Sequence, residues 1–200
     1  CSWTGDGIML ANRLMNKSVL GAATVNWALW DHTLDGAKTM IKNVAVFSPS
    51  VSCEKLDTDK LLVTWYDYDT DNYYAQVVTI SDTTITTNTS YVINDGNDSV
   101  MQSALTILDS GRALFACYTN SGTTIEARVL SISGTTVSAG TQRTLASSPA
   151  SSIRLCKVDT DKCIMIYTGA TNLAAVVTTS GASVNAPGST LSVSAASNSL

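Results

Sequence analysis

The sequence is poor in charge and has no long apolar run. Charged residues make up 14% of its 200 residues, against roughly 25% in an average soluble domain. The net charge is −4, so no basic surface is expected that would attract nucleic acid or anionic lipid. No stretch of about 18 apolar residues occurs, so we expect no membrane insertion. Partners that carry phosphate groups are disfavoured.

Histidine and cysteine are too few, and too scattered, for common metal or nucleophile chemistry. His32 is the only histidine, and no nucleophile motif accompanies it, so we expect a loop residue and not a general base. No CxxC pair or Cys/His cluster with zinc spacing occurs. Since the chain starts at Cys1, we expect it to be processed or part of a longer one. No metal, cofactor or catalytic set is expected.

Most of the cysteines lie in strand-like apolar runs, where a reduced thiol behaves as a small apolar side chain. We expect these thiols to be buried and reduced, with a Cys53–Cys156 bridge as the alternative. The four cysteines in such runs are Cys53, Cys117, Cys156 and Cys163.

Helical periodicity is absent, and a repeat of about fifty residues takes its place. "LDTDKLLVTWYD", "ILDSGRALFACYTN" and "VDTDKCIMIYTG" align at Asp57, Asp109 and Asp159, which lie 52 and 50 residues apart. The downstream phrases "YAQVVTISDTTIT", "IEARVLSISGTTVS" and "LAAVVTTSGASVN" follow the same plan. Asp6 in "TGDGIMLANRL" lies 51 residues before Asp57 and marks a fourth, more diverged copy.

Each period predicts four short antiparallel strands, because β-branched and aromatic runs alternate with Gly, Asp, Asn and Ser clusters. Four strands per unit of this length are typical of a β-propeller blade. We therefore expect an all-β fold with one propeller domain over residues 1–200. Its units are 1–47, 48–98, 99–148 and 149–200. A closed four-bladed ring and four consecutive blades of a larger ring are both open alternatives.

The repeated Asp-Thr-Asp-Lys predicts a turn and not a reactive carboxylate pair. Aspartate accepts hydrogen bonds from nearby main-chain N–H groups and tolerates turn conformations. The copy at Asp109 keeps the first Asp and the basic residue but has Gly111 in place of the second Asp. A turn accepts glycine there, whereas metal binding or catalysis would lose a carboxylate.

The acidic stretch "DYDTDN" is the most ligand-like part of the chain. Its carboxylates Asp67, Asp69 and Asp71 alternate, a pattern that suits calcium, although the glycine and late glutamate of the familiar calcium loop are missing. A solvated loop is the favoured interpretation. Trp65 and Tyr66 are interpreted as residues on opposite faces of a strand.

Aromatic rings beside carboxylates are what a sugar-binding surface uses, since rings stack on sugars while polar groups bind hydroxyls. The predicted ligand-binding surface combines aromatic and acidic residues near this loop: Tyr68, Tyr73, Tyr74, Asp69 and Asp71.

In its repeated phrases, the sequence resembles the propeller-like repeat domains of tailed-phage structural proteins. The phrases that carry the resemblance are "VVTISDTTITTNT" (Val77–Thr89), "VLSISGTTVSAGTQ" (Val129–Gln142) and the preceding apolar-Asp turns. It covers the region from Val51 to about Val193, and the N-terminal quarter departs from it. The resemblance implies a virion-surface, tail or fibre protein and carries no catalytic residues.

The expected function is therefore structural and adhesive, not enzymatic, at a virion surface or outside the cell. Expected partners are other assembly proteins in an oligomer, and host surface glycans. A propeller-fold lectin or carbohydrate-active enzyme is the alternative. An intracellular scaffold of the WD-repeat kind is disfavoured, because its Gly-His and Trp-Asp signatures do not recur at blade spacing.

Overall fold

The computed structural model describes residues 8–9, 24–31, 39–45, 51–67, 69–94, 100–119, 124–147, 152–168 and 172–193. Side chains are described from residue 51 onward, except at 100, 101 and 119. Every regular element in these residues is a β-strand, which confirms the all-β prediction. In this part of the chain we find no helix with the length and apolar character needed to cross a bilayer. Cys1, Asp6 and His32 lie outside the described residues.

The strands form four successive antiparallel sheets, which we call sheets I to IV in chain order. Sheet I has three strands, in the order β1-β2-β3, and the others have five each. Sheet I comprises β1 (Ile8–Met9), β2 (Thr24–Asp31) and β3 (Thr39–Ala45). Sheet II comprises β4 (Val51–Lys55), β5 (Lys60–Asp67), β6 (Asn72–Ser81), β7 (Thr84–Thr87) and β8 (Tyr91–Asn94). Sheet III comprises β9 (Val100–Asp109), β10 (Arg112–Thr119), β11 (Thr124–Ser133), β12 (Thr136–Ala139) and β13 (Arg143–Ser147). Sheet IV comprises β14 (Ser152–Asp159), β15 (Lys162–Thr168), β16 (Asn172–Ser180), β17 (Ser183–Val184) and β18 (Thr190–Ser192).

Sheets II, III and IV share one strand plan. Three strands form a meander, and the fourth position is divided between two short strands that pair with opposite ends of the third. The sequence predicts one strand over "ITTNTSYVI", but the structure breaks it between β7 and β8. Asn88 lies in the break, and its side-chain amide donates to the Val77 carbonyl at 2.9 Å. This amide supplies a hydrogen bond that a continuous strand would have made.

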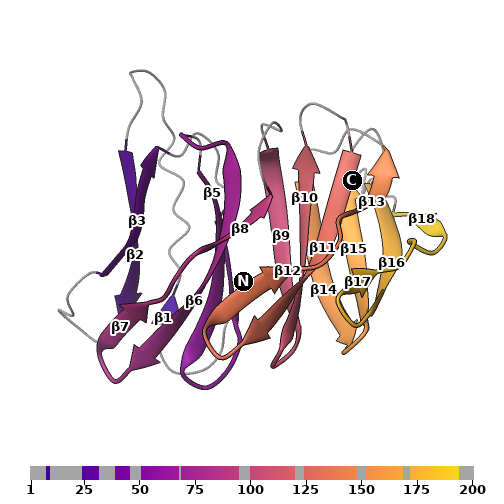
Figure 1. Cartoon of the computed structure of the whole chain (residues 1–200). Helices are drawn as coiled ribbons and strands as arrows, with labels where there is room; N and C mark the ends of the chain where they lie inside the picture. Colours follow the sequence, from indigo (N-terminus) through magenta and orange to yellow (C-terminus); the bar gives the residue numbers. More distant parts are fainter. Residues whose placement is uncertain are drawn as a thin grey trace, which may run out of the picture.

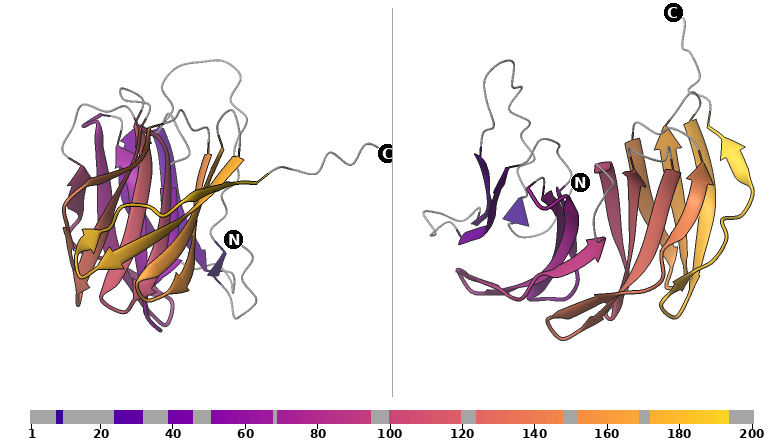
Figure 2. Two further views of the ribbon diagram at one scale, coloured as in Figure 1. Left: turned by 90° about the vertical axis from the view of Figure 1, so that its right-hand side faces the viewer. Right: turned by 45° about the horizontal axis from the view of Figure 1, so that its top comes forward.

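The sheets stack face to face in a row (Figures 1 and 2). The first strands of neighbouring sheets contact one another, β4 with β9 and β9 with β14. Because successive side chains point to opposite faces of a strand, each sheet contributes one face to the interface before it and one to the interface after it. Three buried apolar clusters fill the spaces on the two faces of sheet II and between sheets III and IV.

The interface between sheets II and III shows how the alternation works. Leu62 and Tyr66 of β5 pack in one cluster with Phe115 of β10, while Trp65 packs in a cluster on the other face of sheet II. This confirms that Trp65 and Tyr66 lie on opposite faces of one strand. Both side chains are 4% exposed.

The described strands do not close into a ring. Sheet I and sheet IV lie at opposite ends of the row in Figure 1, and no strand pairing links them. Sheets II, III and IV fall within the predicted units 48–98, 99–148 and 149–200.

Candidate functional site

The acidic loop between β5 and β6 uses two of its carboxylates to hold its own turn. Asp67 is 2% exposed and accepts a hydrogen bond from the Asp69 main-chain N–H at 3.1 Å. Asp71 adopts a left-handed conformation with φ of 55°, and its carboxylate accepts a hydrogen bond from the Tyr66 hydroxyl. Asp69 is exposed. The alternating acids thus build an Asx-type turn that presents Asp69 outward.

The predicted ligand-binding residues do not all lie on one surface. Tyr73 is 0% exposed, with its ring 5.3 Å from Tyr66 and 5.0 Å from Phe115, centre to centre. The prediction of a surface position is wrong for Tyr73, because it lies on the face of β6 that packs against sheet III. Tyr68 lies outside the described residues.

Tyr74 is on the opposite face of β6 and is half-buried. Its ring stacks on Trp65, with ring centres 5.5 Å apart and an angle of 12° between the planes. Its hydroxyl lies 3.2 Å from the Thr70 hydroxyl in the same loop. Tyr74, near the start of β6, therefore lies beside the turn that carries Asp69 and Asp71, and these three residues remain the predicted ligand-binding surface.

The repeated aspartates mark turns, as predicted. Asp57 and Asp159 each accept a hydrogen bond from the next main-chain N–H at 2.7 Å. Asp109 accepts one from Gly111 at 2.9 Å. A second shared bond fixes each turn to the third strand of its own sheet, with donors Ile80, Ile132 and Thr179 and acceptors Asp59, Gly111 and Asp161. No group of three or more His, Cys, Asp or Glu side chains that could hold a metal ion occurs among the described residues.

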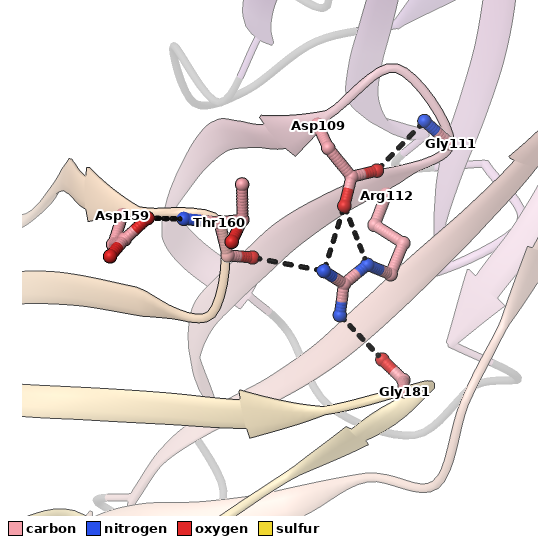
Figure 3. A network of polar contacts seen from close by, with 6 residues as sticks. All are labelled: Asp109, Gly111, Arg112, Asp159, Thr160 and Gly181. Carbon is pink, nitrogen blue, oxygen red and sulfur yellow. Dashed lines mark hydrogen bonds and ion pairs between the residues drawn. The ribbon is translucent and has the colours of Figure 1, made fainter.

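Arg112 extends the turn of sheet III to sheet IV (Figure 3). Its Nε and Nη2 lie 2.8 and 2.7 Å from the Asp109 carboxylate oxygen Oδ2. The same guanidinium donates to the main-chain carbonyls of Thr160 at 3.1 Å and Gly181 at 3.3 Å. Partial burial acts to raise the pKa of Asp109, but the hydrogen bonds from Arg112 and Gly111 and the arginine charge outweigh it and lower that pKa. Sequence reasoning identified the turn but not this contact between sheets.

The basic residues at the equivalent positions in the other sheets behave differently. Lys60 in sheet II approaches the acids of its own turn, with Nζ 3.5 Å from Asp59 and 3.9 Å from Asp57. Lys162 in sheet IV is exposed.

A polar side-chain network that the sequence did not reveal lies between sheets II and III. Arg128 donates to the side-chain oxygen of Gln142, with a distance of 3.1 Å from Nε, and Gln142 donates to the Glu126 carboxylate. These residues line a small crevice together with Asn94, Phe115 and Cys117. Glu126 and Arg128 lie on β11 and Gln142 lies in the segment between β12 and β13, so the network ties this segment to β11 within the crevice.

Two of the described cysteines, Cys53 and Cys163, have thiols whose pKa values are raised. Burial, reinforced by the nearby Glu54, raises the pKa of Cys53 to about 12. Burial likewise raises the pKa of Cys163 to about 11. Such thiols stay protonated and unreactive near neutral pH.

The predicted disulfide alternative is also excluded for the described residues. Cys53, Cys117, Cys156 and Cys163 are all free. Cys53 and Cys156 belong to the first strands of sheets II and IV, with sheet III between them. The expectation that Cys156 is buried is wrong, since it lies exposed on sheet IV.

The described residues form a repeated scaffold, with a turn after β5 and a contact between sheets at Arg112. No protein-family model, curated protein or solved structure matches the chain.

Proposed function

We propose that this chain is a non-enzymatic structural and adhesive module of an extracellular or virion-surface assembly. In this proposal its sheets are consecutive blades of a β-propeller, and the turns along one side of the row attach to a host surface. The phage-like repeat phrases in "VVTISDTTITTNT" and "VLSISGTTVSAGTQ" support the virion setting.

The observation that carries the proposal is the repeat of one strand plan in sheets II, III and IV. A four-stranded meander has two faces, and a propeller buries both by stacking blades against one another. The contacts of β4 with β9 and of β9 with β14 run along the first strands, where blades of a propeller approach its axis. Such a stack suits a scaffold, because each sheet depends only on its neighbours.

The positions of the turns support the adhesive part of the proposal. The turn that carries Asp69 follows β5, and the equivalent strands β10 and β15 both end at the upper side of the row in Figure 1. The sequences after these strands differ, with "DYDTDN", "NSGTT" and "GATN", while the strands themselves repeat. Variable loops on a repeated scaffold are a common way to build a binding surface.

The environment of the acidic loop argues against the carbohydrate-active enzyme alternative. Glycosidases place two carboxyl groups about 5–9.5 Å apart on either side of the scissile bond. In this loop Asp67 is buried and Asp71 accepts the Tyr66 hydroxyl. Asp69 alone is exposed among the three acids, a pattern that supports binding better than hydrolysis.

A glycan array probed with the purified chain tests the adhesive role. We expect binding to a subset of glycans, and we expect the Asp69→Ala and Tyr74→Ala variants to lose it. Asp161→Ala is a matched control, because Asp161 is an exposed acid in a turn at the other end of its strand. Uniform silence of the wild-type chain on the array would contradict the adhesive role.

Hydrolysis of bound glycans would contradict the non-enzymatic part of the proposal. Chromatography of each glycan after incubation with the chain measures it directly. We expect no new product, for the wild type and for Asp69→Ala alike.

A further inference from the structure

One face of sheets II, III and IV carries the same apolar pattern, and we call it the forward face because it points toward the next sheet in the chain. Its cross-strand pairs in the second and third strands are Leu62 with Val77, Leu114 with Val129, and Ile164 with Val176. The pairs of sheets II and III are 0% exposed, whereas Ile164 and Val176 of sheet IV are 37% and 41% exposed. Sheet IV therefore exposes an apolar surface whose counterparts are buried.

The two buried forward faces are covered by the opposite face of the following sheet, which we call its backward face. Phe115 of sheet III packs in one cluster with Leu62 of sheet II. Met165 of sheet IV packs in one cluster with Leu114 of sheet III. Phe115 and Met165 hold the same position in their sheets, since each lies three residues after the basic residue that begins its strand. Both interfaces are therefore built in the same way, from one forward and one backward face.

A glycine beside the apolar pairs shows how closely the next sheet approaches. The main-chain N–H groups of Gly140 and Gly188 donate to the carbonyls of Val129 and Val176, so the two glycines hold equivalent positions in sheets III and IV. A Cβ atom on Gly140 would lie 1.9 Å from the main-chain oxygen of Ala182 in sheet IV, so this close approach requires glycine. Within the described part of the chain, a Cβ atom on Gly188 would meet nothing closer than 3.7 Å. Gly188 thus keeps the space that a following sheet would need.

Lys162 places a cation where Arg112 of sheet III contacts the next sheet. Arg112 donates to the main-chain carbonyls of Thr160 and Gly181 in the turns of sheet IV. Lys162 begins the equivalent strand and is exposed, so the carbonyls of a following turn would suit it as acceptors. At the other end of this face Arg154 is also exposed, and its long side chain can keep the guanidinium in solvent at the rim.

We infer that the forward face of sheet IV binds the backward face of a further sheet of the same strand plan, carried by another protein of the assembly. This occupant continues the two interfaces that the chain already forms, and it fills the space at Gly188. A second copy of the chain does not offer such a face in sheets II, III and IV, because their backward faces are already buried. Trp65, Phe115 and Met165 on these faces are 4%, 1% and 0% exposed.

The inference rests on the propeller part of the proposed function and not on its adhesive part. Glycan binding can fail while sheet IV accepts a further sheet, and the reverse is equally possible. The glycan array and the experiment below therefore give separate answers.

A fused sheet is the probe: the full chain is extended after residue 200 by a second copy of residues 149–200, in which Cys156→Ser removes the duplicate thiol. The original Cys156 is exposed and pairs with Ile164 of the forward face. Its equivalent in sheet III, Thr106, pairs with Leu114 and is 7% exposed. We expect alkylation of the original Cys156, measured by mass spectrometry, to slow at least about ten-fold in the extended chain, because a covered thiol reacts only when the sheets separate. Unchanged alkylation would overturn the inference.

Gly188→Leu tests whether the added sheet docks as sheet IV docks on sheet III. In the unextended chain the new side chain meets open space, so we expect unchanged circular dichroism. In the extended chain we expect Gly188→Leu to restore fast alkylation of Cys156. We expect the same of Ile166→Glu, because Ile166 is 40% exposed on this face and a following sheet would bury the new charge.

Val92→Glu is the matched control, since Val92 is 39% exposed on β8 of sheet II, and we expect Cys156 to stay protected in it. Circular dichroism checks that each variant is folded, and Val176→Glu replaces Ile166→Glu if that variant is not. Protection of Cys156 that survives both Gly188→Leu and the Glu variant would overturn the inference.

Size-exclusion chromatography with light scattering tests the rival occupant, a second copy of the chain. We expect the wild-type chain to remain at its monomer mass of 21.0 kDa over a wide range of concentration. A wild-type dimer that Ile166→Glu dissociates would show that a second copy covers this face, and would also overturn the inference.

Discussion

The guanidinium of Arg112 donates a hydrogen bond to the main-chain carbonyl of Thr160 at 3.1 Å, across 48 residues of sequence. The Asp109 carboxylate orients that guanidinium through Oδ2. The guanidinium of Arg112 in sheet III is thereby held in position to donate to the turn of sheet IV. Since the Thr160 carbonyl belongs to the main chain, the contact does not depend on which side chain sheet IV carries there.

Removal of this contact should weaken the chain. We expect Arg112→Ala to lower the free energy of unfolding by about 1–2 kcal/mol, as hydrogen bonds from a charged donor usually contribute that much. Urea unfolding measures the change. Lys162→Ala is the control, because Lys162 holds the equivalent position in sheet IV, where no further sheet follows among the described residues, and we expect almost no effect. Equal losses in the two variants would contradict the contact between sheets.

The lowered pKa of Asp109 predicts a pH dependence of stability. A folded-state pKa below the ordinary value of about 3.9 means that the unfolded chain binds the proton more readily, so stability rises with pH in that range. The stabilisation is fully present above the ordinary pKa and is lost as pH falls through the folded-state pKa. We expect the difference in unfolding free energy between wild type and Asp109→Asn to be constant near neutral pH and to shrink below about pH 4. Urea unfolding of both proteins across this range checks it, and a difference that persists unchanged in acid would rule the carboxylate out as its source.

Two adjacent tyrosines should respond very differently to truncation. Tyr73 is fully buried between sheets II and III, so Tyr73→Ala leaves a cavity, and we expect a loss of about 3–5 kcal/mol. Tyr74 is half-buried on the other face, so Tyr74→Ala should cost only about 1 kcal/mol. Thermal and urea unfolding of the pair gives the comparison. Similar losses would mean that the two rings are not on opposite faces of β6.

Thr64 offers a substitution that should stabilise the chain. Its side chain is 0% exposed, and its hydroxyl has no hydrogen-bond partner within the described part of the chain. Sheets III and IV carry Ala116 and Ile166 at the same position. We expect Thr64→Val to raise the free energy of unfolding by about 1 kcal/mol, because it removes a buried unpaired hydroxyl while keeping the shape.

Thr64→Ser is the control for this prediction. It keeps the hydroxyl and removes a buried methyl group, so we expect it to lower stability by about 1 kcal/mol. A stabilising Ser variant or a destabilising Val variant in urea unfolding would contradict the predicted cause.

Local sequence chemistry was enough to predict the strands and turns. The aspartates at positions 57, 109 and 159 and the β-branched runs after them marked the same hairpin three times, and the structure has a hairpin at each place. The break at Asn88 was not predicted, because an asparagine that lies within a Thr-rich run has no distinct local signature. Its role depends on the Val77 carbonyl of the neighbouring strand.

Site prediction failed where the answer depends on which face of a strand meets a neighbour. Tyr73 and Tyr74 are adjacent and chemically identical, and only the packing of sheet III against sheet II decides that Tyr73 is buried. The contacts of Arg112 were not predicted for the same reason. The sequence shows its turn, but Thr160 and Gly181 come close to Arg112 only when the sheets are stacked.

The divided fourth strand has a consequence for how the chain avoids aggregation. A long, straight outer strand would leave a row of unpaired N–H and C=O groups that templates the addition of foreign strands. In sheets II, III and IV the outer position holds short strands, such as β7 and β8 or β17 and β18, offset along their partner. Strand-by-strand growth in the manner of an amyloid is therefore discouraged at these edges.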